Sequence, residues 1–338
     1  SMRVLCKALL ATEGQAVQPD GVPQESFKTI NWEKASKLMD KAVDAAIDIE
    51  VKQIADLHSV CHPVHDTPAE YHRSVDLLDR KADGTWKARL CVSLTAHGGT
   101  IDYGIDLYSP TIDIKVVLLV LSIGLQAGSE LTIWDVKAAY LKSPLPTKGV
   151  YVLLKPHVAA KMVECKPEWK SFLRPNGSLM VECDKAWYGL AAAAALWNAE
   201  VHKTLTDACG YTQHSMVSCL YYRRVGKTMC ILMLHVDDIG ALFPPNSAER
   251  ARVKAILEEK YEALKEQTGR NLTYIGMEIV QEDDCFKVSM AKRIGLLEGD
   301  FGGFPVSKAP PINPAKTQSF CTPDAPDCKE YPDTKRLR

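Results

Sequence analysis

The feature that most constrains this chain is an apolar run that ends in two adjacent acids, at residues 231–240. The segment reads ILMLHVDDIG, so Asp237 and Asp238 interrupt the pattern expected of two buried strands. Adjacent carboxylates are costly inside a protein unless a cation or water neutralises them. A hairpin that turns at the two acids would expose them while both strands stay buried. On this segment alone, a solvated turn between core strands and a functional acidic site are equally well supported.

A third acid, Asp135, also follows an apolar run, LTIW at residues 131–134, and precedes a helix-like stretch at residues 137–141. Three carboxylates at two strand ends are the ligands that two divalent cations need for in-line nucleotidyl transfer. One ion would activate a primer hydroxyl, and the other would bind the triphosphate and the leaving pyrophosphate. This interpretation requires the carboxylate of Asp135 to lie within about 4–6 Å of those of Asp237 and Asp238.

The rest of the chain alternates between helix and strand patterns. Residues 75–79 and 86–92 are predicted to form a hairpin, because Asp83 and Gly84 are a strong turn signal. The apolar stretch 112–126 is predicted to be a buried helix, since it is too short to cross a bilayer. Further helices are expected over residues 32–57 with Asn31 as the N-cap, over 190–209 and over 247–266, and further strands over 131–135, 151–154, 179–183, 219–224 and 229–235.

The composition sets two expectations. The 41 Lys and Arg residues against 42 Asp and Glu residues give a net charge of −1, which argues mildly against a strong nonspecific nucleic-acid binder. A local basic groove is compatible with this average. The 11 cysteines are scattered and odd in number, and neither a signal peptide nor an apolar run of spanning length accompanies them. We therefore expect a reduced intracellular protein without a membrane partner.

Four residues with metal-binding side chains crowd into one short stretch: His58, Cys61, His62 and His65. Their spacing is compatible with zinc. No second pair of cysteines lies nearby in the sequence, however, and Pro63 breaks the segment. A polar loop is the favoured interpretation, and a zinc-binding domain is the minor alternative.

Several motifs resemble those of one family. Residues 135–142, DVKAAYLK, are similar to the DVKTAFLNG block of reverse transcriptases from Copia-type (Pseudoviridae-like) LTR retrotransposons. Residues 185–190, KAWYGL, followed by Trp197, resemble the KALYGLKQSPRQW block of that family, and residues 235–238, HVDD, resemble YVDD. Smaller matches occur in the family's order at residues 83–84, 87–90, 101–103, 109–110, 274–279 and 322–323. Each match is weak alone, but the ordered set over residues 45–325 is specific.

This resemblance implies the polymerase region of a polyprotein, with an α+β right-hand polymerase fold whose antiparallel palm sheet packs on helices. It divides the chain into an N-terminal extension and helix (1–44), mainly fingers (45–134), palm with a fingers insertion (135–245), palm end and start of the thumb (246–305) and a loosely ordered tail (306–338). No RNase H acid set and no integrase zinc module can be recognised, so we expect an excised or relict polymerase segment.

The resemblance also implies roles for individual residues. Asp135, Asp237 and Asp238 would bind two Mg²⁺ ions, for which Mn²⁺ could substitute. The dNTP would be contacted by Arg89, Lys81, Tyr140, Tyr188 and Gly189, the primer and template by His235, Ile275 and Gly276, and the leaving pyrophosphate would receive a proton from Lys265. Tyr140 would lie beneath the sugar, where it clashes with a ribose 2′-hydroxyl. A surface charge at Arg89 and a core tyrosine at Tyr140 are the alternatives.

Two departures from the family pattern bear on activity. His235 stands where the family has the tyrosine of YVDD, a change that keeps a ring and a hydrogen-bonding tip. Ala191 to Ala195 are five alanines where the family usually has a polar KQSPR run that approaches template and nucleotide. Alanine favours helix strongly and removes every polar side-chain contact at those positions. We therefore expect weaker binding of template or nucleotide even if the metal site is whole.

The leading hypothesis is an RNA-directed DNA polymerase, a nucleotidyltransferase of a transposable element that uses dNTPs, Mg²⁺ and a primed RNA or DNA template. It would act in a cytoplasmic virus-like particle or in the nucleus, and a homodimer and other polyprotein-derived domains both remain open as partners. The alternative is a catalytically impaired or domesticated scaffold that binds nucleic acid. The near-zero net charge and the alanines favour the scaffold, whereas the three acids oppose it.

Overall fold

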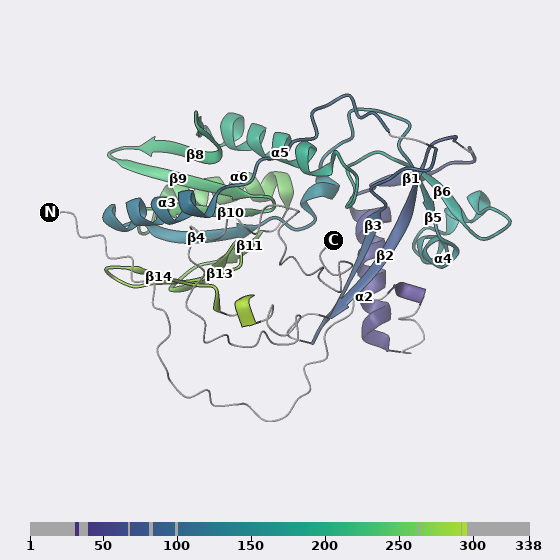
Figure 1. Ribbon diagram of the computed structural model, residues 1–338, viewed down its shortest axis with the longest axis horizontal. Helices are drawn as coiled ribbons and strands as arrows, with labels where there is room; N and C mark the ends of the chain where they lie inside the picture. The colour runs from purple at the N-terminus through teal and green to yellow at the C-terminus, as the bar shows by residue number, and fades with distance from the viewer. Residues whose placement is uncertain are drawn as a thin grey trace, which may run out of the picture. The chain divides into compact units, whose positions relative to one another are not determined.

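The structure is a computed structural model that describes residues 31–33, 40–66, 68–80, 84–98, 101–262, 264–291 and 293–295 (Figure 1). Contacts divide the chain into two units, Ser1–Arg293 and Ile294–Arg338, and every element named below belongs to the first. No helix of the described part is long and apolar enough to cross a membrane. The tail predicted over residues 306–338 lies outside the described residues.

A five-stranded sheet contains the predicted hairpin. Its strand order is β1-β6-β5-β2-β3, formed by Cys61–Pro63 (β1), Leu179–Cys183 (β6), Tyr151–Leu154 (β5), His72–Arg80 (β2) and Trp86–Val92 (β3). β2 and β3 pair antiparallel, from Ser74 opposite Val92 to Arg80 opposite Trp86, which confirms the hairpin. Asp83 of its turn lies outside the described residues. β5 and β6 also pair antiparallel, so the strands predicted on either side of the Pro-containing insertion are confirmed.

A six-stranded sheet carries the predicted acids. Its order is β11-β4-β10-β9-β8-β7, formed by Lys265–Gln267 (β11), Glu130–Asp135 (β4), Asp238–Phe243 (β10), Thr228–His235 (β9), Val217–Val225 (β8) and Thr212–His214 (β7). All neighbouring strands are antiparallel, as predicted. β9 and β10 are buried along most of their length, and only Val236 and Asp237 connect them. The hairpin inferred from the apolar run is therefore present.

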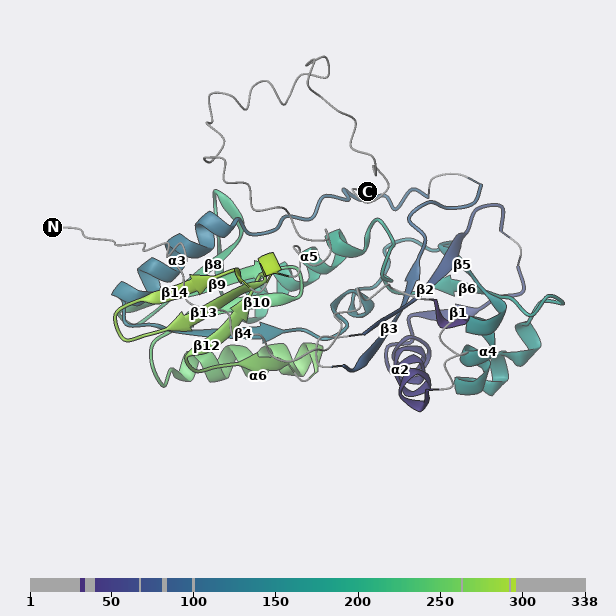
Figure 2. The same ribbon diagram turned by 60° about the horizontal axis from the view of Figure 1, so that its bottom comes forward.

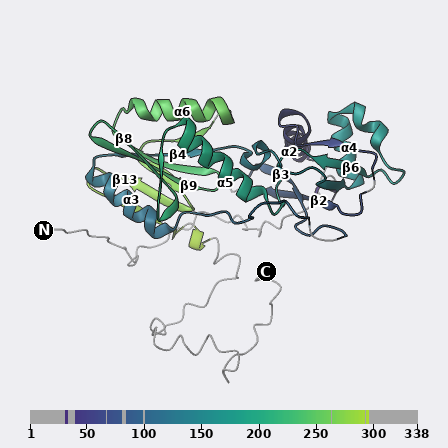
Figure 3. The ribbon, with the colours of Figure 1, turned by 90° about the horizontal axis from the view of Figure 1, so that it is seen from above.

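Helices and a small sheet cover the two faces of this six-stranded sheet. One face packs against α5 (Ala193–Lys203) and α6 (Ala248–Tyr261), and the other against α3 (Ile114–Gln126) and the sheet of β12 (Asn271–Tyr274), β13 (Met277–Gln281) and β14 (Phe286–Ser289). Gly240 and Leu242 share one face of β10, where Gly240 faces Tyr274 and Leu242 faces Gly124 of α3. Figure 2 shows the three small strands side by side, and Figure 3 shows α3 and α6 on opposite sides of the strands.

Further helical segments complete the fold. They are α2 (Lys41–Lys52), η1 (Gln53–Leu57), η2 (Ala139–Lys142), α4 (Pro156–Cys165), η3 (Pro167–Phe172) and η4 (Thr204–Ala208). The predicted helix over residues 32–57 is not continuous, because Asp40 has an extended backbone (φ −95°, ψ 115°). Its side chain accepts a hydrogen bond from the backbone N–H of Ala42 (2.8 Å), so Asp40 caps α2 rather than Asn31.

Two further helix predictions need correction. α6 ends at Tyr261 instead of reaching residue 266, because Glu262 adopts φ +65°, outside the right-handed helical region. The chain then forms β11 at the edge of the six-stranded sheet. The prediction of a buried helix over residues 112–126 is wrong for one face of α3, where Leu119 is 61% exposed and Ile123 is 46% exposed.

Asp76 of β2 has a fully buried carboxylate that binds two other segments of the chain to β2. It accepts hydrogen bonds from Lys155 Nζ (2.6 Å), His157 Nε2 (2.9 Å) and the backbone N–H of Trp32 (2.9 Å). Burial raises the pKa of this carboxyl, but the hydrogen bonds outweigh it and leave the pKa below its ordinary value of 3.8. A lowered acid pKa stabilises the fold above that ordinary value, and the contribution is lost as the pH falls through the folded-state pKa.

Replacing Asp76 by Asn is expected to lower the free energy of unfolding by about 3 kcal/mol at neutral pH, because Lys155 and His157 lose their buried counter-charge. Chemical denaturation measures this change. Asp283→Asn is the control and should have little effect, since the Asp283 side chain is 89% exposed and pairs with Arg270 at the surface. The difference in the free energy of unfolding between wild type and Asp76→Asn should become smaller below about pH 4, where Asp76 becomes protonated in the wild type. A gap that stays constant on acidification would contradict an ionised Asp76.

Candidate active site

The three predicted acids meet at one end of the six-stranded sheet. In the register of β4 and β10, Asp135 lies directly opposite Asp238. Asp237 lies in the turn before β10, and its backbone carbonyl accepts a hydrogen bond from the backbone N–H of Val136 (3.0 Å). Directly opposed residues of antiparallel strands have Cα atoms about 4.5–5.5 Å apart. The sheet therefore brings together acids from two distant segments of the chain.

The acids at this sheet end act on one another electrostatically. Burial and the negative charges of Asp237 and Asp135 raise the pKa of Asp238 to about 6. Burial and Asp135 also raise the pKa of Asp237. Carboxylates that disfavour each other's ionisation are stabilised by a cation, and oxygen ligands are those that Mg²⁺ prefers. The donor set therefore fits a hard divalent cation.

Two lysines are close enough to act on these acids. Lys265 lies opposite Asp135 in the register of β11 and β4, and its charge partly offsets the rise in the pKa of Asp238. It therefore lies on a strand and not on the predicted helix. Lys87 of β3 partly offsets the rise in the pKa of Asp237. The sequence analysis missed Lys87, although it lies two residues before Arg89 and hence on the same face of its strand.

Tyr140 and Tyr188 lie close to the acids. The centroids of their rings are 5.5 Å apart, and the rings are tilted by 51°. Burial raises the pKa of both hydroxyls, and the charge of Asp237 contributes to the rise in each. The structure therefore groups two of the predicted nucleotide-binding residues beside Asp237.

Two hydrogen bonds hold the segment around Tyr188 against β3. The Tyr188 carbonyl accepts a hydrogen bond from the N–H of Val92 (2.6 Å), and the indole N–H of Trp187 donates to the carbonyl of Leu90 (2.7 Å). Gly189 adopts φ +97°, and a Cβ atom there would lie 1.9 Å from the carbonyl oxygen of Val92. A residue with a side chain does not fit at this position, so Gly189 is needed for the close approach.

Of the two basic residues predicted to reach the triphosphate, the structure describes Arg89 but not Lys81. Arg89 Nη1 donates to Asp79 Oδ2 (3.2 Å), and its side chain is 43% exposed. Its charge also acts on the hydroxyl of Tyr188, where it counteracts the rise in pKa. Arg89 is therefore near the tyrosine pair while it is paired across β2 and β3. Lys81 lies outside the described residues.

The residues predicted at the primer end lie in two places. His235 lies opposite Asp238 in the register of β9 and β10. Burial lowers the pKa of its imidazole, and its Nδ1 atom is buried without a hydrogen-bond partner in the described part of the chain. Ile275 and Gly276 form the turn between β12 and β13, with φ +53° and +72°. His235 therefore lies with the acids, whereas the Ile275–Gly276 turn belongs to the three-stranded sheet.

The five alanines occupy mostly buried positions. Ala192, Ala193 and Ala195 are 0%, 2% and 9% exposed. α5 begins at Ala193, as the high helix propensity of alanine predicts. Polar side chains at the three buried positions would need hydrogen-bond partners inside the protein. Only the partly exposed positions Ala191 and Ala194 could therefore present polar side chains to a ligand.

The zinc candidates at residues 58–65 contact separate partners. His62 Nδ1 is 2.6 Å from a carboxylate oxygen of Asp184, and the ring of His65 stacks on Phe172 with 4.2 Å between centroids. Cys61 is buried, and burial raises the pKa of its thiol. A raised thiol pKa opposes the thiolate that zinc requires. Among the described residues, these side chains therefore do not gather into a cluster of metal-ligand atoms. The polar-loop interpretation is wrong for Cys61–Pro63, because these residues form β1 and pair with β6.

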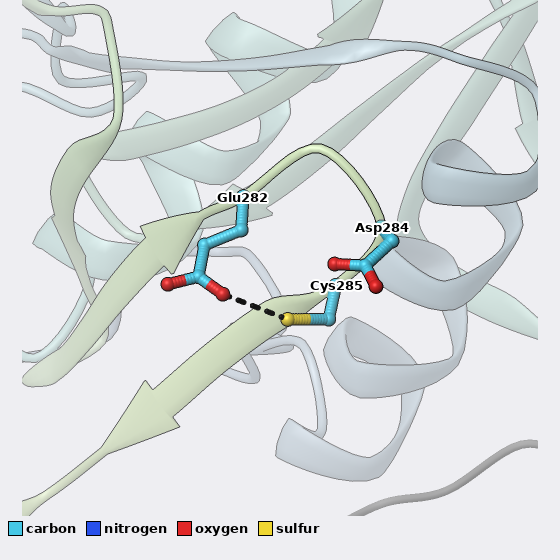
Figure 4. A group of neighbouring side chains, drawn as sticks. All are labelled: Glu282, Asp284 and Cys285. Atoms are coloured by element: carbon cyan, nitrogen blue, oxygen red, sulfur yellow. Dashed lines mark hydrogen bonds between the residues drawn. The ribbon is translucent and has the colours of Figure 1, made fainter.

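A different group has the closest metal-ligand atoms among the described residues. Atoms of Glu282, Asp284 and Cys285, in the turn between β13 and β14, lie within 4.8 Å of one another (Figure 4). The Cys285 thiol donates to Glu282 (3.3 Å), and Lys287 already pairs with Glu282 (2.6 Å). The acids of the six-stranded sheet are not gathered this tightly. What brings these acids together is the strand register and the effect of their charges on one another's pKa.

A comparison with protein families identifies a family to which this chain is similar. The family model described as reverse transcriptase (RNA-dependent DNA polymerase) matches residues 71–302, which is more than half of the chain. The matched stretch contains all the strands from β2 to β14 and all three acids of the sheet end.

Proposed function

Because the chain belongs to the reverse transcriptase (RNA-dependent DNA polymerase) family, we propose that it is the RNA-directed DNA polymerase core of a Copia-type LTR retrotransposon. The observation that carries the proposal is the pairing of Asp135 with Asp238 across β4 and β10, with Asp237 in the adjoining turn. The Copia assignment is supported by the order of the DVKAAYLK, KAWYGL and HVDD motifs along the chain.

In this proposal, Asp135, Asp237 and Asp238 hold two Mg²⁺ ions, or Mn²⁺ in their place. When bound, such ions activate the primer 3′-hydroxyl and neutralise the charge on the triphosphate and the leaving pyrophosphate. The acids supply the negative charge for this site at the end of a buried sheet. Burial and the neighbouring acids raise the pKa of Asp238 to about 6, so we expect cation binding to release a proton from Asp238 near pH 6.

Other residues of the chain would bind and orient the substrates. Lys265, opposite Asp135, would donate a proton to the leaving pyrophosphate. Arg89 and Lys87 of β3 would bind oxygens of the triphosphate, for which the planar guanidinium is well suited. The rings of Tyr140 and Tyr188 would form the wall against which the sugar and base of the incoming nucleotide lie.

The proposal also assigns the layers of the fold. The six-stranded sheet with α5 and α6 would be the palm, the five-stranded sheet the fingers, and the sheet of β12, β13 and β14 the palm end and start of the thumb. β5 and β6 join the same sheet as β2 and β3, which is what a fingers insertion within the palm segment 135–245 requires.

Primer extension tests the proposed activity. Oligo(dT) annealed to poly(rA) is incubated with the protein, dTTP and either Mg²⁺ or Mn²⁺. We expect extension by the wild type and by Asp283→Asn, which alters a surface acid, and none by Asp237→Asn. Extension that survives in Asp237→Asn would refute the catalytic assignment. Binding of template and primer without extension in either metal would support the scaffold alternative.

A further inference from the structure

The turn that carries Asp237 contains a strained residue. Val236 adopts φ +56°, in the left-handed region. A β-branched residue rarely adopts this conformation, because its side chain clashes with the backbone there. Such strain persists only where the surroundings hold it, and it is concentrated at functional sites. Val236 lies immediately before Asp237, so any relaxation of its backbone would move that carboxylate.

Two hydrogen bonds from different elements hold this turn. The indole Nε1–H of Trp197 on α5 donates to the backbone carbonyl of Val236 (2.6 Å). The backbone N–H of Val136, next to Asp135, donates to the carbonyl of Asp237 (3.0 Å). Successive carbonyls of the turn are therefore tied to a helix and to the strand that carries the third acid.

Trp197 is itself held firmly. It is 1% exposed, and its ring packs edge-on against Tyr261 of α6, with 5.1 Å between centroids and 65° between planes. A short hydrogen bond from an immobile donor can maintain an unfavourable backbone angle that a mobile donor could not.

We propose that Trp197 is a positioning residue of the active site, which keeps Val236 in its left-handed conformation and thereby holds Asp237 beside Asp135. The inference rests on the proposed polymerase function. It goes beyond that function because the proposed mechanism gives Trp197 no part in binding or chemistry, and Trp197 acts through the Val236 carbonyl. It also explains why a tryptophan, and not another apolar residue, occupies this core position.

The proposal is tested with Trp197→Phe, which removes the N–H donor and keeps most of the ring. In primer extension with dTTP, kcat should fall about tenfold, the effect of one buried hydrogen bond, while KM for dTTP stays within about twofold. Tyr221→Phe is the matched control, because the Tyr221 hydroxyl bonds His202 Nδ1 (3.1 Å) in the same core but away from the turn. It should lower Tm to a similar extent and leave kcat unchanged.

A second substitution separates positioning from packing. Glycine adopts positive φ without the clash, so Val236→Gly reduces the need for the hydrogen bond from Trp197. The double variant Trp197→Phe/Val236→Gly should therefore lose less than threefold in kcat relative to Val236→Gly alone, a non-additive result. A loss of about tenfold in both backgrounds, or a kcat that follows Tm in every variant, would overturn the proposal.

Hydrogen exchange needs no catalytic activity, so it tests the positioning role of Trp197 separately from the proposed polymerase function. Hydrogen exchange of the turn amides at residues 236–238 should be faster in Trp197→Phe than its loss of stability accounts for, whereas in Tyr221→Phe it should rise only as far as the lower stability requires. Wild-type protein that fails to extend primers would refute the proposed function only. Unchanged exchange in Trp197→Phe would refute the positioning role, whatever the activity.

Discussion

Substitution of Asp238 by Asn is expected to reduce the single-turnover rate of nucleotide addition by about 10³-fold, because it removes a carboxylate worth several kcal/mol of charge stabilisation. Asp238 lies directly opposite Asp135 on the neighbouring strands β10 and β4. The same loss is expected for Asp135→Asn. Rapid-quench measurement of a single dTMP addition quantifies the effect.

The stability of the same variant distinguishes lost chemistry from lost folding. Burial and two neighbouring acids raise the pKa of Asp238, so its ionised form is unfavourable in the folded protein at neutral pH. Removing this charge should therefore leave Tm unchanged or raise it in metal-free buffer. A variant that keeps more than a tenth of the wild-type rate, or that is inactive because its Tm collapses, would contradict the assignment of Asp238.

Substitution of Gly189 by Ala is expected to destabilise the protein by about 3–5 kcal/mol or to prevent folding. A Cβ atom would lie 1.9 Å from the carbonyl oxygen of Val92, and this oxygen cannot retreat easily because the same residue's N–H is bonded to Tyr188 (2.6 Å). The positive φ of Gly189 adds strain for any side chain. Denaturant unfolding measures the loss.

Gly226→Ala is the matched control for this substitution. Gly226 also has a positive φ (+60°), but a Cβ atom there meets nothing within 4 Å. Its substitution should cost about 1 kcal/mol, the conformational term alone. A similar loss of stability in Gly189→Ala and Gly226→Ala would contradict the close contact between Gly189 and the carbonyl of Val92.

Local patterns were sufficient to predict most strands. The apolar runs at residues 131–135 and 229–235 lie in β4 and β9, as expected for apolar stretches that are too short for a typical helix. The segment at Lys265 was mispredicted as helix, since Lys, Glu and Gln all favour helix in isolation. Its pairing with the edge of β4 is a tertiary contact that overrides this propensity.

The sequence alone was enough to select the candidate acids, but not to show which strands bring them together. Asp237 and Asp238 stand out because two adjacent acids follow an apolar run. Their meeting with Asp135 depends on β4 lying beside β10, a sheet order that no local pattern encodes. For the same reason, the effect of Lys87 on Asp237 and the hydrogen bond from Trp197 could not be inferred, because both join segments far apart in the chain.

Template-directed addition of a single nucleotide to a primer on an RNA template tests the central claim most directly. Four templates that differ only in the first unpaired base are each offered all four dNTPs with Mg²⁺. We predict addition of the complementary nucleotide on every template, dependent on the metal and absent in Asp237→Asn. Addition without regard to the template base, or no addition in either Mg²⁺ or Mn²⁺ by protein that binds the template and primer, would contradict an RNA-directed DNA polymerase.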